Sequence, residues 1–218
     1  MRGQSAEIDW KDGTPVARRF DDPYFSLADG PAETAHVFLA GNDLPARFAD
    51  GFHVAELGFG TGLNFLMTLA AWRAAGAPGR LRFTSFEAYP MATPDLARAL
   101  AACGAPLADT LAGGVPESPL ELADATLTVI AGDARETLPR WRGRADAWFL
   151  DGFSPPKNPE LWTDALLAEV ARHTAPGGTA ATYSAAGHVR RALAAAGFAV
   201  DRAPGYGRKR HMTRARLA

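Results

Sequence analysis

The sequence predicts an α/β protein with a doubly wound, mostly parallel sheet and a small N-terminal cap. Three observations support this fold class. From residue 52 onward, short apolar strands alternate with helical segments, the pattern of a parallel sheet with helices on its faces. A glycine-rich loop joins the first of these strands to a helix. The chain has 218 residues, 47% of them hydrophobic and 22% charged, so it can bury a full core.

The predicted N-terminal cap covers residues 1–50. Its expected elements, in order, are a hairpin of 6–10 and 15–20, an irregular segment of 21–26 and a helix of 31–39. The hairpin is predicted because an Asp-Gly pair, a strong signal for a tight turn, joins two short extended runs. The helix is predicted because Pro31 suits its first turn and Gly41 follows as a stop.

The second predicted unit, residues 51–218, contains the sheet. Its expected strands are 52–57, 81–87, 127–131, 147–150, 179–183, 198–202 and 211–216, the last two forming a closing pair. Its expected helices are 63–75, 93–102, 161–173 and 187–196. Residues 105–121 match no clear pattern, so the sequence leaves the middle connection of the sheet open.

Composition excludes several classes of protein. The single cysteine, Cys103, excludes an intrachain disulfide framework, and the five scattered histidines have no spacing typical of a metal site. No apolar run approaches about 18 residues, so no membrane-spanning helix is predicted. Residues 1–10 are polar and acidic, unlike a signal peptide. We therefore expect a cytoplasmic protein that binds neither a membrane nor a metal.

Charge is distributed unevenly along the chain. The formal net charge is −1, yet residues 202–218 contain five arginines, one lysine and no acid. This basic end could contact an anionic partner such as a nucleic acid. It could equally be a solvated surface, because arginine outnumbers lysine throughout the chain.

The strongest local motif is the run Glu-Leu-Gly-Phe-Gly-Thr-Gly at residues 56–62. The helix after it would face a ligand with free N–H groups. A dinucleotide-binding loop has the spacing G-x-G-x-x-G, whereas this loop has G-x-G-x-G with an acid two residues earlier. That version resembles the first motif of class I, Rossmann-like methyltransferases, which bind S-adenosylmethionine (SAM). A glycine turn that serves packing alone is the alternative. The predicted cofactor-binding residues here are Glu56, Gly58, Phe59, Gly60, Gly62 and Asn64.

Two further acids end core strands. Glu87 closes the second strand, where a carboxylate accepts hydrogen bonds from the hydroxyls of an adenosine ribose. Asp133 follows the third strand, where it could accept from the adenine amine or simply cap the next helix. Because the carboxyl ends of parallel strands share one edge of a sheet, both acids and Glu56 are expected at the rim where ligands bind.

The most distinctive segment is 148–162, which reads WFLDGFSPPKNPELW and follows the fourth core strand. It resembles the Asp or Asn followed by prolines and an aromatic that amine-directed methyltransferases carry at this place. Asp151 is the predicted catalytic residue, because an amine is mostly protonated at neutral pH. A carboxylate that accepts its N–H orients the lone pair and helps to take the proton. Phe153 could stack on a planar base or pack in the core.

The one cysteine bears on the choice of acceptor atom. Methylation of a pyrimidine ring carbon needs a cysteine nucleophile. Cys103 is predicted at the end of a helix, away from every strand-end motif, where it would be a small buried hydrophobe. Transfer to an amine nitrogen needs no covalent step, so an amine acceptor is favoured.

Six segments together resemble the methyltransferase domain of the bifunctional tRNA-modifying enzyme MnmC, whose stand-alone form is called MnmD. They are residues 9–10, 13–15, 20–26, 56–65, 149–159 and 205–210. They span nearly the whole chain in order, and the run DGFSPPKNP is specific. The resemblance implies SAM-dependent methylation of the 5-aminomethyl group of 5-aminomethyl-(2-thio)uridine at the wobble position of tRNA, giving the 5-methylaminomethyl nucleoside.

The resemblance also implies partners. The tRNA anticodon loop is the expected partner, and the expected substrate-binding residues are Tyr24, Phe153, Lys157, Arg208, Lys209 and Arg210. In MnmC an FAD-dependent oxidoreductase domain follows and removes a carboxymethyl group first. A separate oxidoreductase is therefore expected to supply the aminomethyl substrate, or the chain is a fragment of a bifunctional enzyme. Two other functions stay open: a SAM-dependent methyltransferase for a protein or small-molecule amine, and a non-catalytic SAM-binding module.

Overall fold

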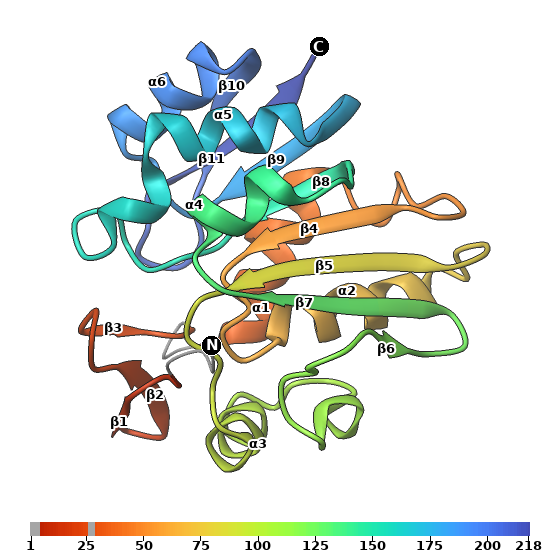
Figure 1. The fold of residues 1–218 in the computed structure, drawn as a ribbon, viewed down its shortest axis with the longest axis vertical. Helices are drawn as coiled ribbons and strands as arrows, with labels where there is room; N and C mark the ends of the chain where they lie inside the picture. The colour runs from red at the N-terminus through yellow and green to blue at the C-terminus, as the bar shows by residue number, and fades with distance from the viewer. Residues whose placement is uncertain (1–4, 26–28) are drawn as a thin grey trace.

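The computed structural model describes residues 5–25 and 29–218 (Figure 1). At its centre lies an eight-stranded sheet in the order β10-β11-β9-β8-β4-β5-β7-β6. Its strands are β4 (His53–Leu57), β5 (Leu81–Glu87), β6 (Leu120–Glu121), β7 (Ala125–Ala131), β8 (Ala145–Leu150), β9 (Thr174–Thr182), β10 (Phe198–Pro204) and β11 (His211–Leu217). The strands from β9 to β7 are parallel, and β10, β11 and β6 pair antiparallel at the edges. The predicted doubly wound, mostly parallel sheet is confirmed.

Helices cover both faces of this sheet (Figure 1). The α-helices are α1 (Gly30–Thr34), α2 (Leu63–Ala74), α3 (Thr93–Ala102), α4 (Ala134–Thr137), α5 (Asp164–Arg172) and α6 (Gly187–Ala195). Short π or 3-10 segments are η1 (Ala35–Leu39), η2 (Ala40–Asn42), η3 (Ala108–Leu111), η4 (Leu138–Arg140) and η5 (Pro159–Trp162). The helical segments η1, α2 and α3 pack on one face, and α4, α5 and α6 pack on the other.

The central strands are buried on both sides, so their side chains alternate between two cores. Phe83 and Phe149 lie in the core beneath α2 and α3. Phe86 and Trp148 lie in the core beneath α5 and α6. This arrangement explains why β8 is apolar on both faces from Ala147 to Leu150.

The chain order of the strands creates a switch point beside β4. From β4 the chain adds β5 and then β7 on one side, and it returns to add β8 on the other side of β4. The loops after β4 and β8 therefore leave the sheet side by side at its carboxyl edge. In open α/β sheets, ligands bind in the crevice at such a point.

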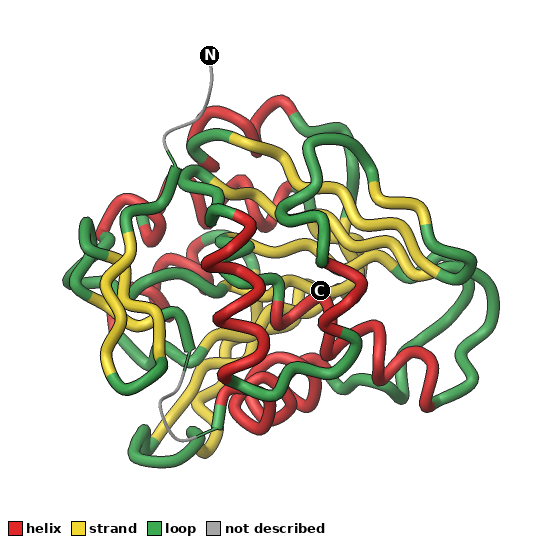
Figure 2. The backbone as a smooth tube through the Cα atoms, turned by 90° about the horizontal axis from the view of Figure 1, so that it is seen from below, coloured by secondary structure: helices red, strands yellow, loops and turns green. Residues whose placement is uncertain are grey.

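The N-terminal hairpin forms a separate three-stranded sheet of β1 (Ile8–Lys11), β2 (Thr14–Ala17) and β3 (Asp22–Pro23). Figure 2 shows these strands set apart from the main sheet, at one end of the molecule. The predicted hairpin is confirmed. The expected irregular segment differs, because its residues Asp22 and Pro23 pair with β2, while residue 26 lies outside the described residues. The division into units 1–50 and 51–218 stays a prediction.

Two other segments differ from expectation. The unassigned stretch 105–121 contains η3 and then β6, which extends the sheet as a short antiparallel edge strand. The helix predicted over 161–173 starts later, as α5, because Thr163 caps it by accepting a hydrogen bond from Leu166 N. The preceding residues form η5.

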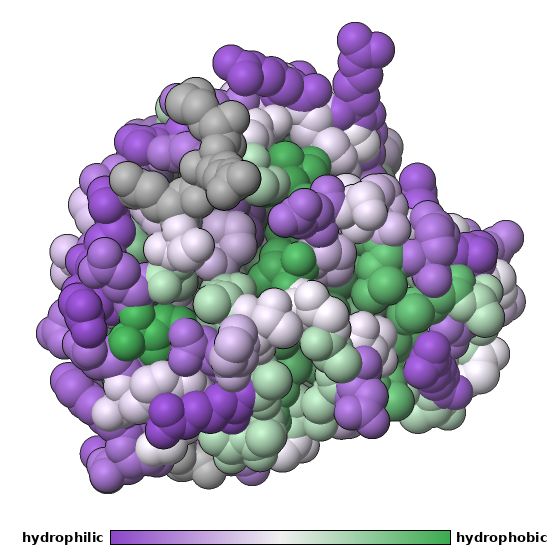
Figure 3. Space-filling view, turned by 60° about the horizontal axis from the view of Figure 1, so that its bottom comes forward, coloured by the Kyte–Doolittle hydropathy of each residue, from purple (hydrophilic) through white to green (hydrophobic). Residues whose placement is uncertain are grey.

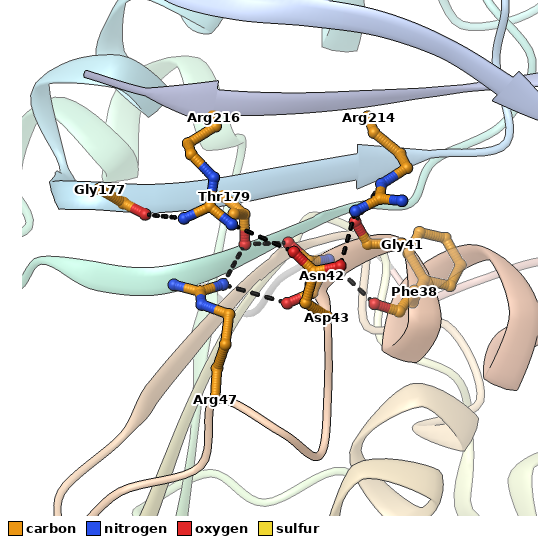
Figure 4. A network of polar contacts seen from close by, with 9 residues as sticks. All are labelled: Phe38, Gly41, Asn42, Asp43, Arg47, Gly177, Thr179, Arg214 and Arg216. Atoms are coloured by element: carbon orange, nitrogen blue, oxygen red, sulfur yellow. Dashed lines mark hydrogen bonds and ion pairs between the residues drawn. The ribbon is translucent and has the colours of Figure 1, made fainter.

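A network of polar side chains joins the C-terminal strands to the segment after η2 (Figure 4). Asp43 pairs with Arg214 at 2.6 Å and with Arg216 at 3.1 Å. The buried Asn42 accepts a hydrogen bond from Thr179 Oγ1 at 2.6 Å. Two of the six cations in the basic C-terminal segment therefore have a structural role.

Hydrophobic and hydrophilic side chains are mixed over the surface. On the face shown in Figure 3, hydrophilic side chains surround separate hydrophobic patches. Leu107 is the one large hydrophobic side chain among the described residues that is exposed, at 37%. The patches are therefore mainly partly buried side chains. None of the helices in residues 5–25 and 29–218 is long and apolar enough to cross a membrane.

Candidate functional site

A cleft of about 1530 Å³ opens at the carboxyl edge of the sheet, between the strand ends and the N-terminal hairpin. Most of the predicted site residues line it: Tyr24, Gly58, Phe59, Gly60, Asn64, Glu87, Asp133, Asp151, Phe153, Lys157, Arg208 and Lys209. Glu56, Gly62 and Arg210 do not line it. A Cβ on Gly62 would lie 2.5 Å from Leu111 Cδ1 and 2.8 Å from Phe59 Cζ, so Gly62 serves the packing behind the loop.

Glu87 holds the glycine loop from the end of β5. Its Oε2 accepts a hydrogen bond from Gly60 N at 2.9 Å, and its Oε1 accepts one from Tyr89 N at 2.7 Å. Burial raises the pKa of this carboxyl, and the backbone N–H donors oppose that shift. The backbone N–H groups of Phe59 and Ala88 also lie close enough to lower this pKa, so several donors share the acceptor positions of the carboxylate. Glu87 lines the cleft at the strand end where the ribose of the cofactor is predicted to bind.

Asp133 caps α4 and also faces the cleft. Its Oδ1 accepts a hydrogen bond from Arg135 N at 2.9 Å, and its carboxylate pairs with the Arg135 guanidinium at 2.6 Å. Hydrogen bonding to Arg135 lowers the pKa of Asp133. The helix-cap interpretation of Asp133 therefore holds in the structure, and the residue lines the cleft as well.

Asn64, in the first turn of α2, joins two carboxylates with one amide group. Its Nδ2 donates to Glu56 Oε1 at 2.8 Å and to Asp151 Oδ2 at 2.7 Å. Its own Oδ1 accepts from Thr34 Oγ1 at 2.9 Å. Glu56 is fully buried and also accepts from Ser85 Oγ at 2.6 Å. Glu56 therefore lies behind the cleft wall and supports Asn64.

Asp151 follows β8 and is packed closely against the glycine loop. A Cβ on Gly58 would lie 2.3 Å from the Asp151 carbonyl oxygen, so only glycine fits there. Burial raises the pKa of the Asp151 carboxyl to about 7, while the hydrogen bond from Asn64 acts in the opposite direction. Its Oδ1 accepts no hydrogen bond from the described residues, which leaves that oxygen for a ligand.

Aromatic side chains form the wall beside Asp151. Phe153 stacks on Phe20, with ring centroids 4.7 Å apart, and meets Tyr24 edge to face at 5.2 Å. All three rings line the cleft. Tyr183, at the end of β9, donates a hydrogen bond to Gly152 O at 2.7 Å and holds the Asp151 loop from the other side. The wall can take a planar ring.

Two of the predicted cationic residues are engaged with acids. Lys209 Nζ lies 2.8 Å from Glu33 Oε1 and 3.8 Å from the centre of the Tyr183 ring. Lys157 Nζ contacts the carboxylates of Asp21 and Asp22 at 3.5 and 3.6 Å, which ties the proline loop to the hairpin.

Arg208 and Arg210 differ from these lysines. Both are exposed, and neither has an ion-pair partner within residues 5–25 and 29–218. Arg208 lines the cleft, whereas Arg210 lies outside it.

Sequence reasoning missed several residues of this site. Glu33 and Thr34 come from α1, Phe20 from the segment after β2, and Tyr183 from the end of β9. Tyr183 could have been found, because it ends a predicted strand at the ligand-binding edge. Glu33 and Thr34 gave no local signal, since their contacts with Lys209 and Asn64 join segments far apart in the chain.

The described residues contain no group of three or more His, Cys, Asp or Glu side chains arranged to hold a metal ion. Cys103 is half-buried at the end of α3, donates to Leu100 O at 3.5 Å and does not line the cleft. The side chains that line the cleft around Asp151 are carboxylates, an amide and aromatic rings.

Curated relatives match nearly the whole chain. A protein of Stutzerimonas stutzeri named tRNA 5-methylaminomethyl-2-thiouridine biosynthesis bifunctional protein MnmC is 46% identical over 98% of this chain and 35% of its own length. The protein of the same name from Chromobacterium violaceum is 46% identical over 100% of this chain and 35% of its own length. The chain thus spans about a third of the length of these relatives.

A solved structure gives the same picture for the fold. The crystal structure of MNMC2 from Aquifex aeolicus superposes with a TM-score of 0.78, at 28% identity, and covers 99% of this chain and 72% of that one. A family model described as S-adenosyl-L-methionine-dependent methyltransferase matches residues 107–218, just over half of the chain. Because this match covers more than half of the chain, from η3 to β11, the protein belongs to the S-adenosyl-L-methionine-dependent methyltransferases.

Proposed function

We propose that this methyltransferase modifies the 5-aminomethyl group of 5-aminomethyl-(2-thio)uridine at the wobble position of tRNA, giving the 5-methylaminomethyl nucleoside. The observation that carries the proposal is Asp151, which lies between the glycine loop and an aromatic wall and has one carboxylate oxygen that accepts no hydrogen bond from the described residues. The relatives are named for 5-methylaminomethyl-2-thiouridine biosynthesis in tRNA, which supports the same acceptor.

We assign the cofactor side of the cleft to the strand ends and the glycine loop. SAM, when bound, supplies an electrophilic methyl group. Glu87 would hold its ribose and Asp133 its adenine, with Gly58, Phe59 and Gly60 lining the methionine side. Glu56 and Gly62 would act from behind this wall, Glu56 through Asn64 and Gly62 through packing.

Asp151 would act on the acceptor amine. Its Oδ2 is fixed by Asn64, so Oδ1 accepts an N–H of the amine and aims the nitrogen lone pair. A carboxyl with a pKa of about 7 is suited to take up a proton near neutral pH. Tyr24 and Phe153 would enclose the uridine ring from the side of the hairpin.

The RNA would approach across the loop between β10 and β11. Arg208 and Arg210 are the side chains there that can meet phosphates, because both are exposed and have no acid partner among the described residues. Lys157 and Lys209 would contact RNA only by exchanging their present acids for phosphates. Residues 1–50 would form a cap on the methyltransferase unit of residues 51–218. A separate oxidoreductase, or further chain beyond this sequence, would supply the aminomethyl nucleoside.

The test is methyl transfer to a defined RNA. Wild-type protein is incubated with SAM and tRNA that carries the 5-aminomethyl nucleoside, and the nucleosides are analysed by mass spectrometry. The proposal requires that the wobble nucleoside gains one methyl group. Asp151→Ala should lower turnover by about 100-fold or more, with nearly unchanged SAM affinity by calorimetry. SAM binding without transfer to this tRNA would contradict the proposal and favour another amine acceptor or a binding module.

A further inference from the structure

A second hollow lies at the opposite edge of the sheet from the cleft. It has a volume of about 410 Å³ and is formed by the connection from η4 to β8 and by the end of α5. We call it the amino-edge hollow. Its lining residues are Pro139, Arg140, Trp141, Arg142, Gly143, Arg144, Arg172 and His173. Since β8 has six residues, the hollow is roughly 20 Å from Asp151 at about 3.3 Å per residue.

Positive charge gathers in the amino-edge hollow, although the whole chain has a net charge of −1. Arg140, Arg142 and Arg144 are exposed, and none has an ion-pair partner in the described part of the chain. Arg172 is held by Glu169 and donates to Pro139 O at 3.1 Å. The lining therefore contains four guanidinium groups and no carboxylate, and only Arg172 is paired with an acid among the described residues, so the hollow has an unbalanced positive charge.

A buried ring nitrogen without a partner is also found in the hollow. His173 is 4% exposed, and its Nδ1 donates to Gly143 O at 2.8 Å. Its Nε2 makes no hydrogen bond in the structure, and the nearest acid oxygen, Oε2 of Glu169, is 3.8 Å away. Buried polar atoms are normally satisfied, so Nε2 is an unsatisfied group in the wall of the hollow. Because Nδ1 is occupied by Gly143 O, only Nε2 could donate to an anion, when it carries a proton.

The floor of the amino-edge hollow is formed by packed aromatic rings. Trp141 packs against His173, with ring centroids 5.3 Å apart, and against Trp148 of the core at 6.0 Å. A Cβ on Gly143 would lie 2.2 Å from the Trp141 ring, so the ring can pack against the backbone of residue 143 only because that residue is glycine. The packing of Trp141 thus holds the loop that bears Arg140, Arg142 and Arg144 in place.

We propose that the amino-edge hollow binds a phosphate group. Arginine forks match phosphate oxygens in pairs, and several of them around one hollow give a site for a doubly charged anion. Two sources have this chemistry: the backbone of the tRNA, whose recognition rests on the function proposed above, and a small phosphorylated molecule. The RNA source would extend the footprint from the cleft to the far edge of the sheet.

The experiment compares three variants. The test variant is Arg140→Gln/Arg142→Gln/Arg144→Gln, and Arg→Lys at the same three positions keeps the charge but removes the fork. The control is Arg98→Gln/Arg191→Gln, which removes two exposed arginines that have no ion pair within the described residues and lie outside the basic C-terminal segment. SAM affinity, measured by calorimetry, reports that each variant is folded with an intact cleft.

Two measurements separate the sources. The first is tRNA affinity as a function of salt, where the log–log slope should flatten by roughly 0.7 to 0.9 for each phosphate that the variant no longer binds. The second is titration with pyrophosphate, followed by the NMR signals of the His173 ring. The test variant should flatten the slope and abolish the signal change, whereas the control should resemble wild type.

Each result decides a point. A flattened slope in the test variant supports the RNA source. A His173 response to pyrophosphate with an unchanged slope supports the small molecule. An unchanged slope together with no His173 response in wild type overturns the proposal. If the wild-type protein binds no tRNA, the proposed function fails by itself, and the pyrophosphate titration still tests the hollow.

Discussion

Lys209 and Glu33 form an ion pair at the mouth of the cleft, with 2.8 Å between Nζ and Oε1. Both charges act on Asp151: Glu33 raises the pKa of its carboxyl and Lys209 lowers it. Three other groups lie near Asp151. Asn64 donates a hydrogen bond to it and also joins it to Glu56, and the charge of Asp151 acts on the Tyr183 hydroxyl. The pair thus sets two opposed charges beside the group proposed to take the proton.

Removing the charge of Lys209 and removing the charge of Glu33 should therefore shift the pH dependence of methyl transfer in opposite directions. Activity requires ionised Asp151, so the rate at saturating SAM should rise with pH through the region near its pKa of about 7. Lys209→Met should move this rise to higher pH and Glu33→Gln to lower pH. The measurement is the pH profile of kcat/KM for tRNA. Shifts of the same sign would rule out this role for the pair, and Lys11→Met, at a hairpin position that does not line the cleft, serves as the control.

Asp151 should also make stability depend on pH. Its pKa is raised from 3.8 to about 7 in the folded protein, so between these values the folded state holds more protons than the unfolded state. The free energy of unfolding contributed by this group therefore falls as pH rises from 4 to 7. Asp151→Asn removes that dependence, and its advantage over wild type should grow between about pH 5 and pH 8. Urea unfolding at the two pH values measures it.

The control for this measurement is Asp124→Asn. The hydrogen bond from Arg73 lowers the pKa of Asp124, so this carboxyl is ionised in both states throughout the same pH range. The change in unfolding free energy should then be equal at both pH values. An equal effect for Asp151→Asn as well would mean that its pKa is not raised.

Asn64→Leu should destabilise the protein more than Thr34→Val. The leucine leaves Glu56 and Asp151 without their shared donor, and each unsatisfied buried group costs about 1–3 kcal/mol. The valine removes only the donor to Asn64 Oδ1, at a cost of about 1 kcal/mol. Urea unfolding at neutral pH compares the two variants. Equal losses would show that the amide is not the critical link.

The basic C-terminal segment should divide into two groups of residues. Arg208→Ala/Arg210→Ala should flatten the salt dependence of tRNA binding by roughly 0.7 to 0.9 per phosphate and leave the melting temperature unchanged. Arg214→Ala/Arg216→Ala should lower the melting temperature, because Asp43 then has neither of its partners. Binding and thermal unfolding of the two double variants test this division. A salt slope unaffected by the first pair would assign it to solvated surface.

The strand ends were predictable because hydrophobic periodicity and glycine spacing are local properties of the chain. Glu56, Glu87 and Asp133 were placed at the correct edge of the sheet for that reason. Whether a strand-end acid faces the cleft depends on neighbouring strands, so the burial of Glu56 behind Asn64 could not be inferred. The pairing of Lys209 with Glu33 joins residues 176 positions apart and has no local signature. The edge strand β6 was missed because two residues carry no periodicity.

The close approach of Gly58 and Asp151 has a consequence for how this sequence can change. The position of a Cβ at 58 is 2.3 Å from the backbone oxygen of residue 151, so the first glycine of the cofactor motif is required by the loop that bears the proposed proton acceptor. The glycine loop and the Asp151 loop, more than ninety positions apart in the sequence, therefore constrain each other and have to change together. Grafting either segment alone into a related scaffold should fail unless the other accompanies it.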